Sequence, residues 1–451
     1  MEHVNQLRRL GLFDAKVPRY TSYPPATKFS NDVTGAVFLD WIAAIPQGAR
    51  ISLYLHVPFC RRLCWFCACR TRGVRSDDPV LAYVATLTQE IGALGRALPQ
   101  GVTVARLHWG GGTPTLLGAP VMRDLAQSLR AAMPFAPDAA FSVEIDPNEI
   151  DTARIDALAE AGMTRASIGV QDFDPDIQQI IGRVQGYEVT RAAVEGLRAA
   201  GIRSLNADIL FGLPEQTMAR LSDSVQMLMS LNPDRVALYG YAHVPWMAKR
   251  QAMIPTELLP SPEARLDLFD TARRLFLWDG YQEIGIDHFA RPEDSIAVAA
   301  RTGHLRRNFQ GYTDDTCDVL IGLGASAISR FPQGFAQNAS STAAYQKAVR
   351  AGQMATGRGH VFKGEDRLRA RMIEMLMCDF HIDSAALMRD FDVPHERLAA
   401  IYAKAADQFA GMLTIDAKGL SILPQGRALT RMIARTLDAY ETQGQGHSSA
   451  I

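Results

Sequence analysis

The chain has 451 residues, of which 47% are hydrophobic and 21% are charged, and this composition is typical of a globular protein with a large core. Its 47 basic and 48 acidic residues give a formal net charge of −1, so the overall charge does not favour binding to nucleic acid or to an anionic membrane. We find neither an apolar run long enough to span a membrane nor a signal peptide, and we expect a cytoplasmic protein.

The first two-thirds of the chain read as an arm followed by a regular alternation of strands and helices. Prolines and aromatic residues in PRYTSYPPATKF (18–29) indicate an extended arm. The strands that we expect after it are 51–57, 105–109, 141–145, 165–170, 205–211 and 235–241, and the helices are 79–98, 119–132, 151–161, 187–200 and 217–229. This alternation predicts an α/β fold with a partial parallel (β/α)6-type barrel, because parallel strands need crossover helices.

The last third of the chain has a different pattern. Residues 281–330 predict two more short strands around the Gly-rich loop GLGAS (322–326), and from about residue 361 helical segments are separated by short turns, with a possible hairpin at 412–424. We therefore expect three parts, namely an N-terminal arm (1–36), a barrel with an extension (37–355) and a mainly helical C-terminal domain (356–451). We expect the protein to be a monomer.

Four of the six cysteines lie within ten residues, at Cys60, Cys64, Cys67 and Cys69. They directly follow the first expected strand, at the end of a parallel sheet where such folds place active sites. Structural zinc normally uses two separated cysteine pairs, so thiols crowded into one loop favour a [4Fe–4S] cluster over zinc or unligated redox thiols. Three of these thiols can hold three irons and leave the fourth iron open. Cys69 is awkwardly close to Cys67 for a fourth ligand, and we expect it beside the cluster.

The spacing C-x3-C-x2-C, with Phe66 before its third cysteine, resembles the signature of the radical S-adenosylmethionine (SAM) superfamily. The longer segment YLHVPFCRRLCWFCAC (54–69) resembles one family within it, the oxygen-independent coproporphyrinogen III oxidases. Further segments that resemble this family are RYTSYP (19–24), HWGGGTPT (108–115), VEIDP (143–147), SIGVQDF (167–173), DILFGLP (208–214) and RNFQGYT (307–313). The resemblance covers about residues 18–440.

The resemblance implies an activity and its cofactors. The activity is the oxidative decarboxylation of two propionate side chains of coproporphyrinogen III to vinyl groups, which gives protoporphyrinogen IX in haem biosynthesis. A 5′-deoxyadenosyl radical, generated from SAM at a [4Fe–4S] cluster, would remove the hydrogen atoms. Cys60, Cys64 and Cys67 would bind the cluster, Cys69 would be a catalytic residue, and a reductant such as flavodoxin or ferredoxin would supply electrons.

The family also implies two SAM molecules, one on the cluster and a second beside it. The implied contacts of the first are Tyr54, Gly111, Glu144 and Ile328, and those of the second are Phe66, Gly112, Thr113, Gln171, Arg183, Asp208 and Ala242. Taken singly, these residues have plainer interpretations, since a glycine triplet is often only a turn and a polar strand residue often faces solvent. Glu144, Gln171 and Asp208 nevertheless lie near the carboxyl ends of three successive expected strands, which favours a shared site. The string around Arg183 departs somewhat from the family pattern.

Three other functions remain open at this point, one of them a radical methyltransferase of related sequence. A haem-binding chaperone on the same scaffold is the nearer alternative, although that branch typically lacks both the arm and the counterpart of Cys69. A zinc-binding module without enzymatic activity is the more distant one. The basic group Arg301, Arg306 and Arg307 could pair with substrate propionates or belong to a solvated loop.

Overall fold

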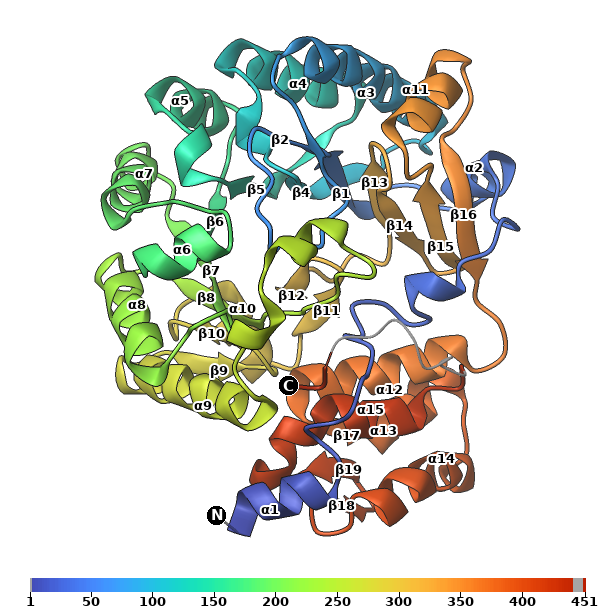
Figure 1. The fold of residues 1–451 in the computed structure, drawn as a ribbon. Coiled ribbons are helices and arrows are strands. Elements are labelled where there is room, and N and C mark those ends of the chain that lie inside the picture. Colours follow the sequence, from blue (N-terminus) through green and yellow to red (C-terminus); the bar gives the residue numbers. More distant parts are fainter. Residues whose placement is uncertain (1, 441–448) are drawn as a thin grey trace.

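The computed structural model describes residues 2–440 and 449–451. Within them, one twelve-stranded sheet runs in the order β16-β15-β14-β13-β1-β4-β5-β6-β7-β8-β10-β9 (Figure 1). The six predicted strands are β1 (Arg50–Val57), β4 (Thr103–Gly111), β5 (Phe135–Ile145), β6 (Arg165–Gln171), β7 (Ser204–Phe211) and β8 (Arg235–Gly240). They pair in parallel, and β13 (Leu320–Leu323) joins β1 in parallel on the other side. The predicted α/β fold with a partial parallel barrel is therefore confirmed.

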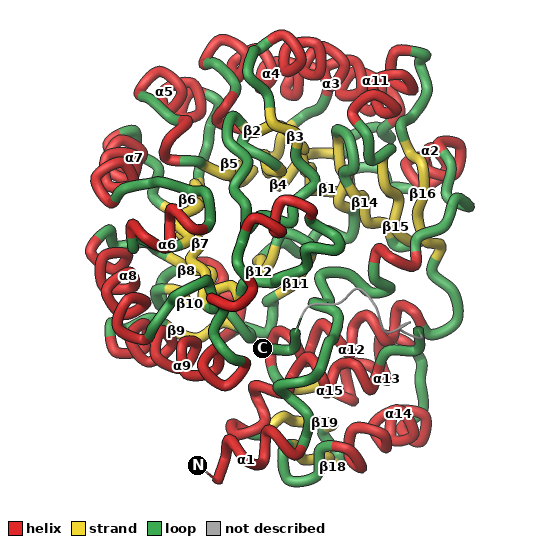
Figure 2. Tube along the Cα trace, in the orientation of Figure 1, coloured by secondary structure: helices red, strands yellow, loops and turns green. Residues whose placement is uncertain are grey.

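Helices cover the outer face of this curved sheet, and loops lie across its centre in the view of Figure 2. The outer helices are α3 (Asp78–Ala97), α4 (Ala119–Ala132), α5 (Thr152–Glu160), α7 (Tyr187–Ala199), α8 (Met218–Ser230) and α9 (Pro262–Trp278), with the short α6 (Pro175–Ile180) after β6. Helix α5 shows how capping side chains and glycines mark the ends of these helices. The Asp151 side chain accepts a hydrogen bond from the Arg154 amide at the start of α5, and Gly162 follows its end with φ 86°. Residues 51–57 are all buried because the sheet is covered on both faces.

The sheet continues at both edges through short strands. Between residues 281 and 330 the structure has six strands where the sequence predicts two, because runs of three or four residues carry almost no periodic signal. They are β9 (Gln282–Ile284), β10 (His288–Ala290), β11 (Arg306–Asn308), β12 (Gly311–Thr313), β13 and β14 (Ile328–Phe331). The pair that flanks the Gly-rich loop, β13 and β14, is the predicted one. Strands β15 (Gly334–Asn338) and β16 (Thr356–Val361) complete the edge beyond β14. In the described residues no pairing joins β9 to β16, so the sheet is open.

The C-terminal module is mainly helical, as expected. It consists of α12 (Asp366–Asp379), α13 (Ser384–Phe391), α14 (His395–Gln408) and α15 (Thr430–Leu437), with a small sheet of β17 (His381–Asp383), β18 (Leu413–Asp416) and β19 (Gly419–Ile422). Strands β18 and β19 form the hairpin expected at 412–424. Because β16 is hydrogen-bonded to β15, the large sheet runs past residue 355, where we expected the barrel unit to end.

The N-terminal arm packs against this C-terminal module. Helix α1 (Glu2–Arg9) lies beside β18 and β19 (Figure 1), and Leu7, Leu12 and Tyr20 join a core cluster whose other members come mostly from residues 368–437. The Tyr20 hydroxyl donates a 3.1 Å hydrogen bond to Asp438 Oδ2. Further short elements are α2 (Gly35–Ala43), α10 (Ser295–Arg301), α11 (Thr342–Arg350) and the 3₁₀ helices η1 (Ala26–Lys28), η3 (Pro147–Glu149), η4 (Lys249–Met253), η5 (Thr256–Leu258) and η6 (Pro424–Leu429). No described helix is long and apolar enough to cross a membrane.

Candidate active site

A cavity of about 400 Å³ lies inside the curve of the parallel strands. Twelve of the fifteen predicted site residues line it, and these are Cys60, Cys64, Phe66, Cys67, Cys69, Gly111, Gly112, Thr113, Glu144, Gln171, Arg183 and Asp208. Residues that are more than 140 positions apart in sequence are thus brought into one wall. Tyr54, Ala242 and Ile328 are not part of this wall.

The three predicted residues outside the wall lie behind it or on a neighbouring strand. The Tyr54 ring stacks on His108, which lines the cavity, with ring centroids 5.7 Å apart. The carbonyl of Ala242 accepts a 3.0 Å hydrogen bond from the side chain of Gln251, which also donates to the Phe66 carbonyl at 2.6 Å. Ile328 begins β14, next to β13.

The cysteine loop is closed by two short parallel strands, β2 (Phe59–Cys60) and β3 (Arg72–Gly73), in which Cys60 pairs with Gly73. Within the loop, the Cys67 amide donates to the Cys64 carbonyl at 3.3 Å, and the Trp65 amide donates to the Ile181 carbonyl at 2.9 Å. These bonds anchor the loop to itself and to the end of α6. The loop therefore has a defined backbone that turns its thiols toward the cavity.

Hydrogen-bond donors are directed at the sulfur atoms. Arg183 Nη1 lies 3.6 Å from Cys64 Sγ, and the Cys69 amide lies 3.4 Å from Cys67 Sγ. Burial raises the pKa of the Cys60 and Cys64 thiols, whereas the hydrogen bond from the Cys69 side chain lowers the pKa of Cys67. Three thiols in one loop, with N–H donors on two of them, form a donor set that fits an iron–sulfur cluster.

The glycine segment at the end of β4 passes directly against the start of the cysteine loop. The amides of Gly112 and Thr113 donate to the carbonyls of Val57 and Phe59, each at 2.8 Å. Gly111 has φ 118°, and a Cβ there would lie 2.7 Å from the His56 ring, while a Cβ on Gly112 would lie 2.5 Å from the Phe59 carbonyl oxygen. A side chain at Gly111 would therefore collide with the His56 ring, and one at Gly112 would push the two backbones apart.

Two carboxylates lie on strands of the same sheet, Glu144 near the carboxyl end of β5 and Asp208 on β7, with β6 between them. Glu144 accepts from the Gly111 amide at 3.0 Å and contacts His108 Nε2 at 3.3 Å. Burial opposes ionisation of Glu144, but the bonds from His108 and Gly111 outweigh it and hold its pKa below the ordinary value. Burial instead raises the pKa of Asp208 to about 6, against a 2.8 Å hydrogen bond from the Asn206 side chain. The site thus holds one firmly ionised carboxylate and one that titrates near neutrality.

Arg183 and Gln171 complete this polar wall. Arg183 donates to the Gly169 carbonyl at 2.9 Å and lies 3.5 Å from Asp146, so its guanidinium links the cysteine loop to β5 and β6. Gln171 ends β6 with φ 71°, in the left-handed region that is uncommon for a side chain of its size. This backbone conformation turns the end of β6 at the cavity.

Sequence reasoning missed several cavity residues, among them Arg106, Ser142, Arg165, Asn206 and Tyr239. Most of them lie at even spacings before a predicted residue on the same strand, as Asn206 does before Asp208. Because side chains two apart on a strand share a face, this period could have identified them. The group at 301–307 is absent from the cavity wall. Arg307 donates instead to the carbonyls of Arg19 and Tyr20, at 3.0 and 2.5 Å.

Residues 54–228 match the family described as the radical SAM superfamily. Together with the partial barrel and the three-thiol loop at the carboxyl ends of its strands, this match defines a radical SAM enzyme, whose cofactors are a [4Fe–4S] cluster and SAM.

Full-length relatives narrow the class further. The chain is 63% identical over 451 residues, all of both chains, to the oxygen-independent coproporphyrinogen III oxidase of Paracoccus denitrificans. It is 39% identical over 429 residues to the protein of that name from Escherichia coli, covering 94% of this chain and 93% of the relative. The solved structure of the E. coli coproporphyrinogen III oxidase HemN, described as a radical SAM enzyme, superposes with a TM-score of 0.90 at 36% identity, over 95% of this chain and 100% of that one. The chain belongs to the family of oxygen-independent coproporphyrinogen III oxidases.

Proposed function

We propose that this chain converts coproporphyrinogen III to protoporphyrinogen IX without oxygen, as a step of haem biosynthesis. The observation that carries the proposal is the three-thiol loop over a polar cavity, in a chain 63% identical along its whole length to a named oxidase of this substrate. When bound, the cluster and SAM supply an adenosyl radical that can remove a hydrogen atom from an unactivated carbon. Each propionate then loses CO₂ and one electron, which an external acceptor takes, and a vinyl group remains.

The chain's own residues hold these cofactors in place. Cys60, Cys64 and Cys67 bind the cluster, and the N–H donors on Cys64 and Cys67 stabilise their thiolates. Cys69 lines the cavity without being a ligand and acts beside the substrate. Its position two residues after the last ligand keeps it within the same wall.

Two SAM molecules share the polar wall in this proposal. Tyr54, Gly111, Glu144 and Ile328 contact the first molecule, which binds the cluster. Phe66, Gly112, Thr113, Gln171, Arg183, Asp208 and Ala242 contact the second. Support comes from the carboxylates of Glu144 and Asp208, which can accept hydrogen bonds from ribose hydroxyls, and from the glycine backbone, which admits close approach.

The electron donor that we propose is an acidic one-electron carrier such as a flavodoxin or a ferredoxin. Five arginines and no carboxylates occur in residues 60–75, although the whole chain is nearly neutral. Four of them, Arg62, Arg70, Arg72 and Arg75, are exposed. A positive surface directly over the cysteine loop would attract an acidic donor and orient it toward the cluster.

We also propose that the protein works as a cytoplasmic monomer with a separate helical domain at about residues 356–451. All six cysteines are free thiols, which fits a reducing compartment. The twelve predicted residues that line the cavity all come from this chain, so none of them has to be supplied by a second copy. The arm at 1–36 joins the core of the helical module and thereby links the two ends of the chain.

Product analysis after anaerobic reconstitution tests this function. We expect the reconstituted protein, given SAM, a reductant and an electron acceptor, to convert coproporphyrinogen III to protoporphyrinogen IX, and we expect Cys64→Ser to make no product. A haem titration in parallel separates the chaperone alternative. Tight haem binding with no decarboxylation by the iron-loaded protein would replace the proposal with the chaperone.

A further inference from the structure

Three arginines lie at the end of the cavity farthest from the cysteine loop, and the function described so far leaves them without a role. Arg165 and Arg235 are the first residues of β6 and β8, and Arg106 lies in the first half of β4. All three line the cavity. They form the floor of the barrel, while the thiols lie at the opposite, carboxyl ends of the strands.

Arg235 has a structural explanation. It is 4% exposed, and its guanidinium holds both oxygens of the buried Asp294 at 2.6 and 3.2 Å. Asp294 in turn accepts from the Ile296 amide at the start of α10. This two-bond ion pair neutralises both charges and needs no further partner.

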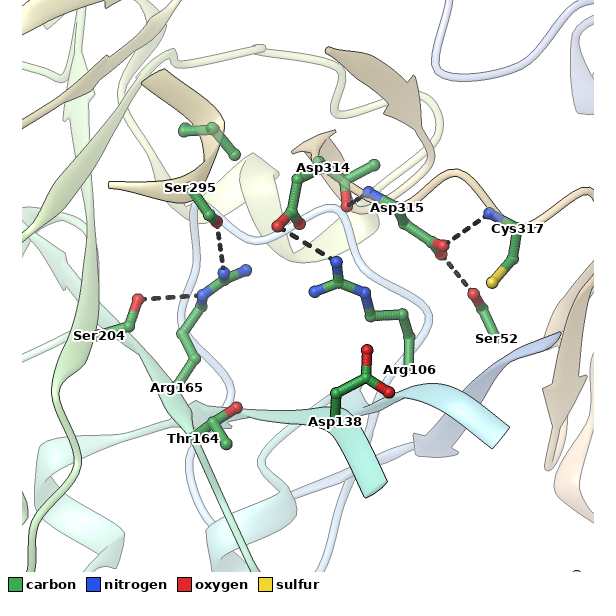
Figure 3. Close-up of polar contacts among 12 residues, drawn as sticks. Ser52, Arg106, Asp138, Thr164, Arg165, Ser204, Ser295, Asp314, Asp315 and Cys317 are labelled. Atoms are coloured by element: carbon green, nitrogen blue, oxygen red, sulfur yellow. Dashed lines mark hydrogen bonds and ion pairs between the residues drawn. The ribbon is translucent and has the colours of Figure 1, made fainter. Parts of the chain in front are cut away.

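Arg106 and Arg165 are balanced less completely. Arg106 Nη2 lies 3.2 Å from Asp314 Oδ2, whereas Arg165 donates to two neutral hydroxyls, those of Ser204 at 3.1 Å and Ser295 at 3.2 Å. Figure 3 shows both guanidinium groups turned toward the same carboxylate, Asp314. One carboxylate thus stands between two cations.

Two further carboxylates lie nearby, and Asp315, like Asp314, lines the cavity. Asp138 binds Arg50 at 2.9 Å, and Asp315 binds the Ser52 hydroxyl and, at 2.9 Å, the Cys317 amide (Figure 3). Burial and the neighbouring Arg235 lower the pKa of Arg165 to about 10, which still leaves it cationic at neutral pH. Arg165 therefore lines the cavity as a cation whose described hydrogen bonds go only to hydroxyl groups, so a carboxylate that enters the cavity can pair with it.

We propose that Arg106 and Arg165 bind a carboxylate of the tetrapyrrole, namely a propionate that the reaction leaves intact. This inference rests on the proposed function and names the part of the substrate that the floor recognises. A retained propionate fits this place because the reacting propionate must lie at the other end of the cavity, near the cysteine loop. Anchoring one carboxylate at the floor fixes which side chain reaches the cofactors.

Binding of a stable, fluorescent analogue tests the floor directly. The reconstituted protein is titrated anaerobically with coproporphyrin III and, separately, with its tetramethyl ester, which has the same ring without charge. We expect Arg165→Gln and Arg106→Gln each to weaken binding of the acid by about 10- to 100-fold, because each removes a charge-assisted hydrogen bond. Binding of the ester should not change. Arg165→Lys, which keeps the charge, should recover part of the affinity.

Arg50→Gln is the matched control, because Arg50 belongs to the adjacent strand, pairs with Asp138 outside the cavity and is half exposed. The proposal is overturned if both Gln variants bind the acid as tightly as the wild type, or if acid and ester lose affinity equally. Should Arg165→Gln fail to fold, the partly exposed Arg106 gives the same test. Product formation by the wild type is measured in a separate assay. Normal binding of the acid by the variants would contradict only the role of Arg106 and Arg165, whereas absence of product would contradict the decarboxylase function.

Discussion

Cys60, Cys64 and Cys67 differ from Cys317 and Cys378 in their surroundings. They share one loop and one cavity, whereas Cys378 is buried in a small apolar cluster. We expect Cys60→Ser, Cys64→Ser and Cys67→Ser each to remove most of the bound iron and all activity, because three thiolates leave no spare ligand. Iron analysis and the visible absorption spectrum after reconstitution measure this, with Cys317→Ser as the control. Near-normal iron in any of the three loop variants would contradict the ligand assignment.

Cys69 tests the distinction between ligand and neighbour. Its amide is directed at Cys67 Sγ, and its side chain lines the cavity. We expect Cys69→Ser to keep the cluster, since serine preserves the backbone donor, and to lower turnover of the tetrapyrrole by at least tenfold. The measurement is iron content together with product formation. Loss of iron in this variant would make Cys69 a ligand.

Asp208 lets the second SAM site be tested by pH as well as by mutation. Because burial raises its pKa to about 6, the carboxylate that accepts hydrogen bonds is present above pH 6 and is lost as the pH falls through 6. We expect SAM stoichiometry to decline toward one below that pH. Asp208→Ala should show one bound SAM at every pH and incomplete conversion of the substrate, with affinity for the second SAM about 10- to 100-fold weaker. Equilibrium binding of labelled SAM measures this.

Asp223 offers the matched control for that experiment, because it is exposed on the outer helix α8. Asp223→Ala should bind two SAM molecules with the same pH profile as the wild type. A wild-type stoichiometry of one, or an Asp208→Ala protein that still binds two, would exclude a second site at Asp208.

Elements differ in how far sequence alone predicts them. The six strands of the barrel are long, apolar runs such as 51–57, and α4 has the predicted limits of 119 and 132. Strands β9 to β12 escaped prediction because three residues carry no measurable period, and their pairing depends on long-range neighbours such as β8. The same division applies to the site. The cysteine spacing is visible in the local sequence, whereas Arg106 and Arg165 meet in one cavity wall only because the sheet brings β4 and β6 together.

Glu90 on α3 joins three elements that are distant in sequence. Its carboxylate accepts hydrogen bonds of 2.7 Å from the Gly324 amide, the Asn338 side chain and the Tyr345 hydroxyl. These bonds hold the Gly-rich loop between β13 and β14 against the helix. Burial nevertheless raises the pKa of Glu90 from 4.5 to about 7, so the charged form is the less stable one in the folded protein.

A raised carboxyl pKa makes folding take up a proton between pH 4.5 and 7, so stability falls as the pH rises through this window. The shift corresponds to roughly 3 kcal/mol. We expect Glu90→Gln to remove this dependence, so that the Tm of the variant rises relative to the wild type between pH 5 and pH 8. Scanning calorimetry at both pH values measures the change, with the exposed Glu195→Gln as the control. A constant Tm difference across this range would show that Glu90 does not titrate there.

At the scale of the whole molecule, charge is distributed unevenly. The chain is almost neutral, with a formal net charge of −1, yet arginines gather at two places around the cavity. The floor holds Arg106 and Arg165 inside the barrel, and the cysteine loop holds exposed arginines outside it. At the floor Asp314 and Asp315 lie beside these arginines, whereas residues 60–75 contain no carboxylate. An acidic electron donor would therefore be attracted to the cysteine loop, at the opposite end of the site from Arg165.

The outer basic surface gives a test that is independent of the substrate. We expect the double variant Arg70→Glu and Arg72→Glu to slow reduction of the cluster by an acidic flavodoxin or ferredoxin by about 10-fold or more at low ionic strength, because charge complementarity sets the rate of such encounters. The deficit should shrink as salt is added, since screening weakens exposed charges. Reduction by dithionite, a small molecule that needs no protein docking surface, should stay unchanged.

Lys404→Glu is the control, because it lies on the exposed face of α14 and changes the net charge by the same amount per residue. The cluster of this variant should be reduced by the protein donor at the wild-type rate. If the double variant loses iron, Arg75→Glu, just beyond β3, repeats the test outside the loop. Equal rates with the protein donor in wild type and variants would place the electron entry elsewhere on the molecule.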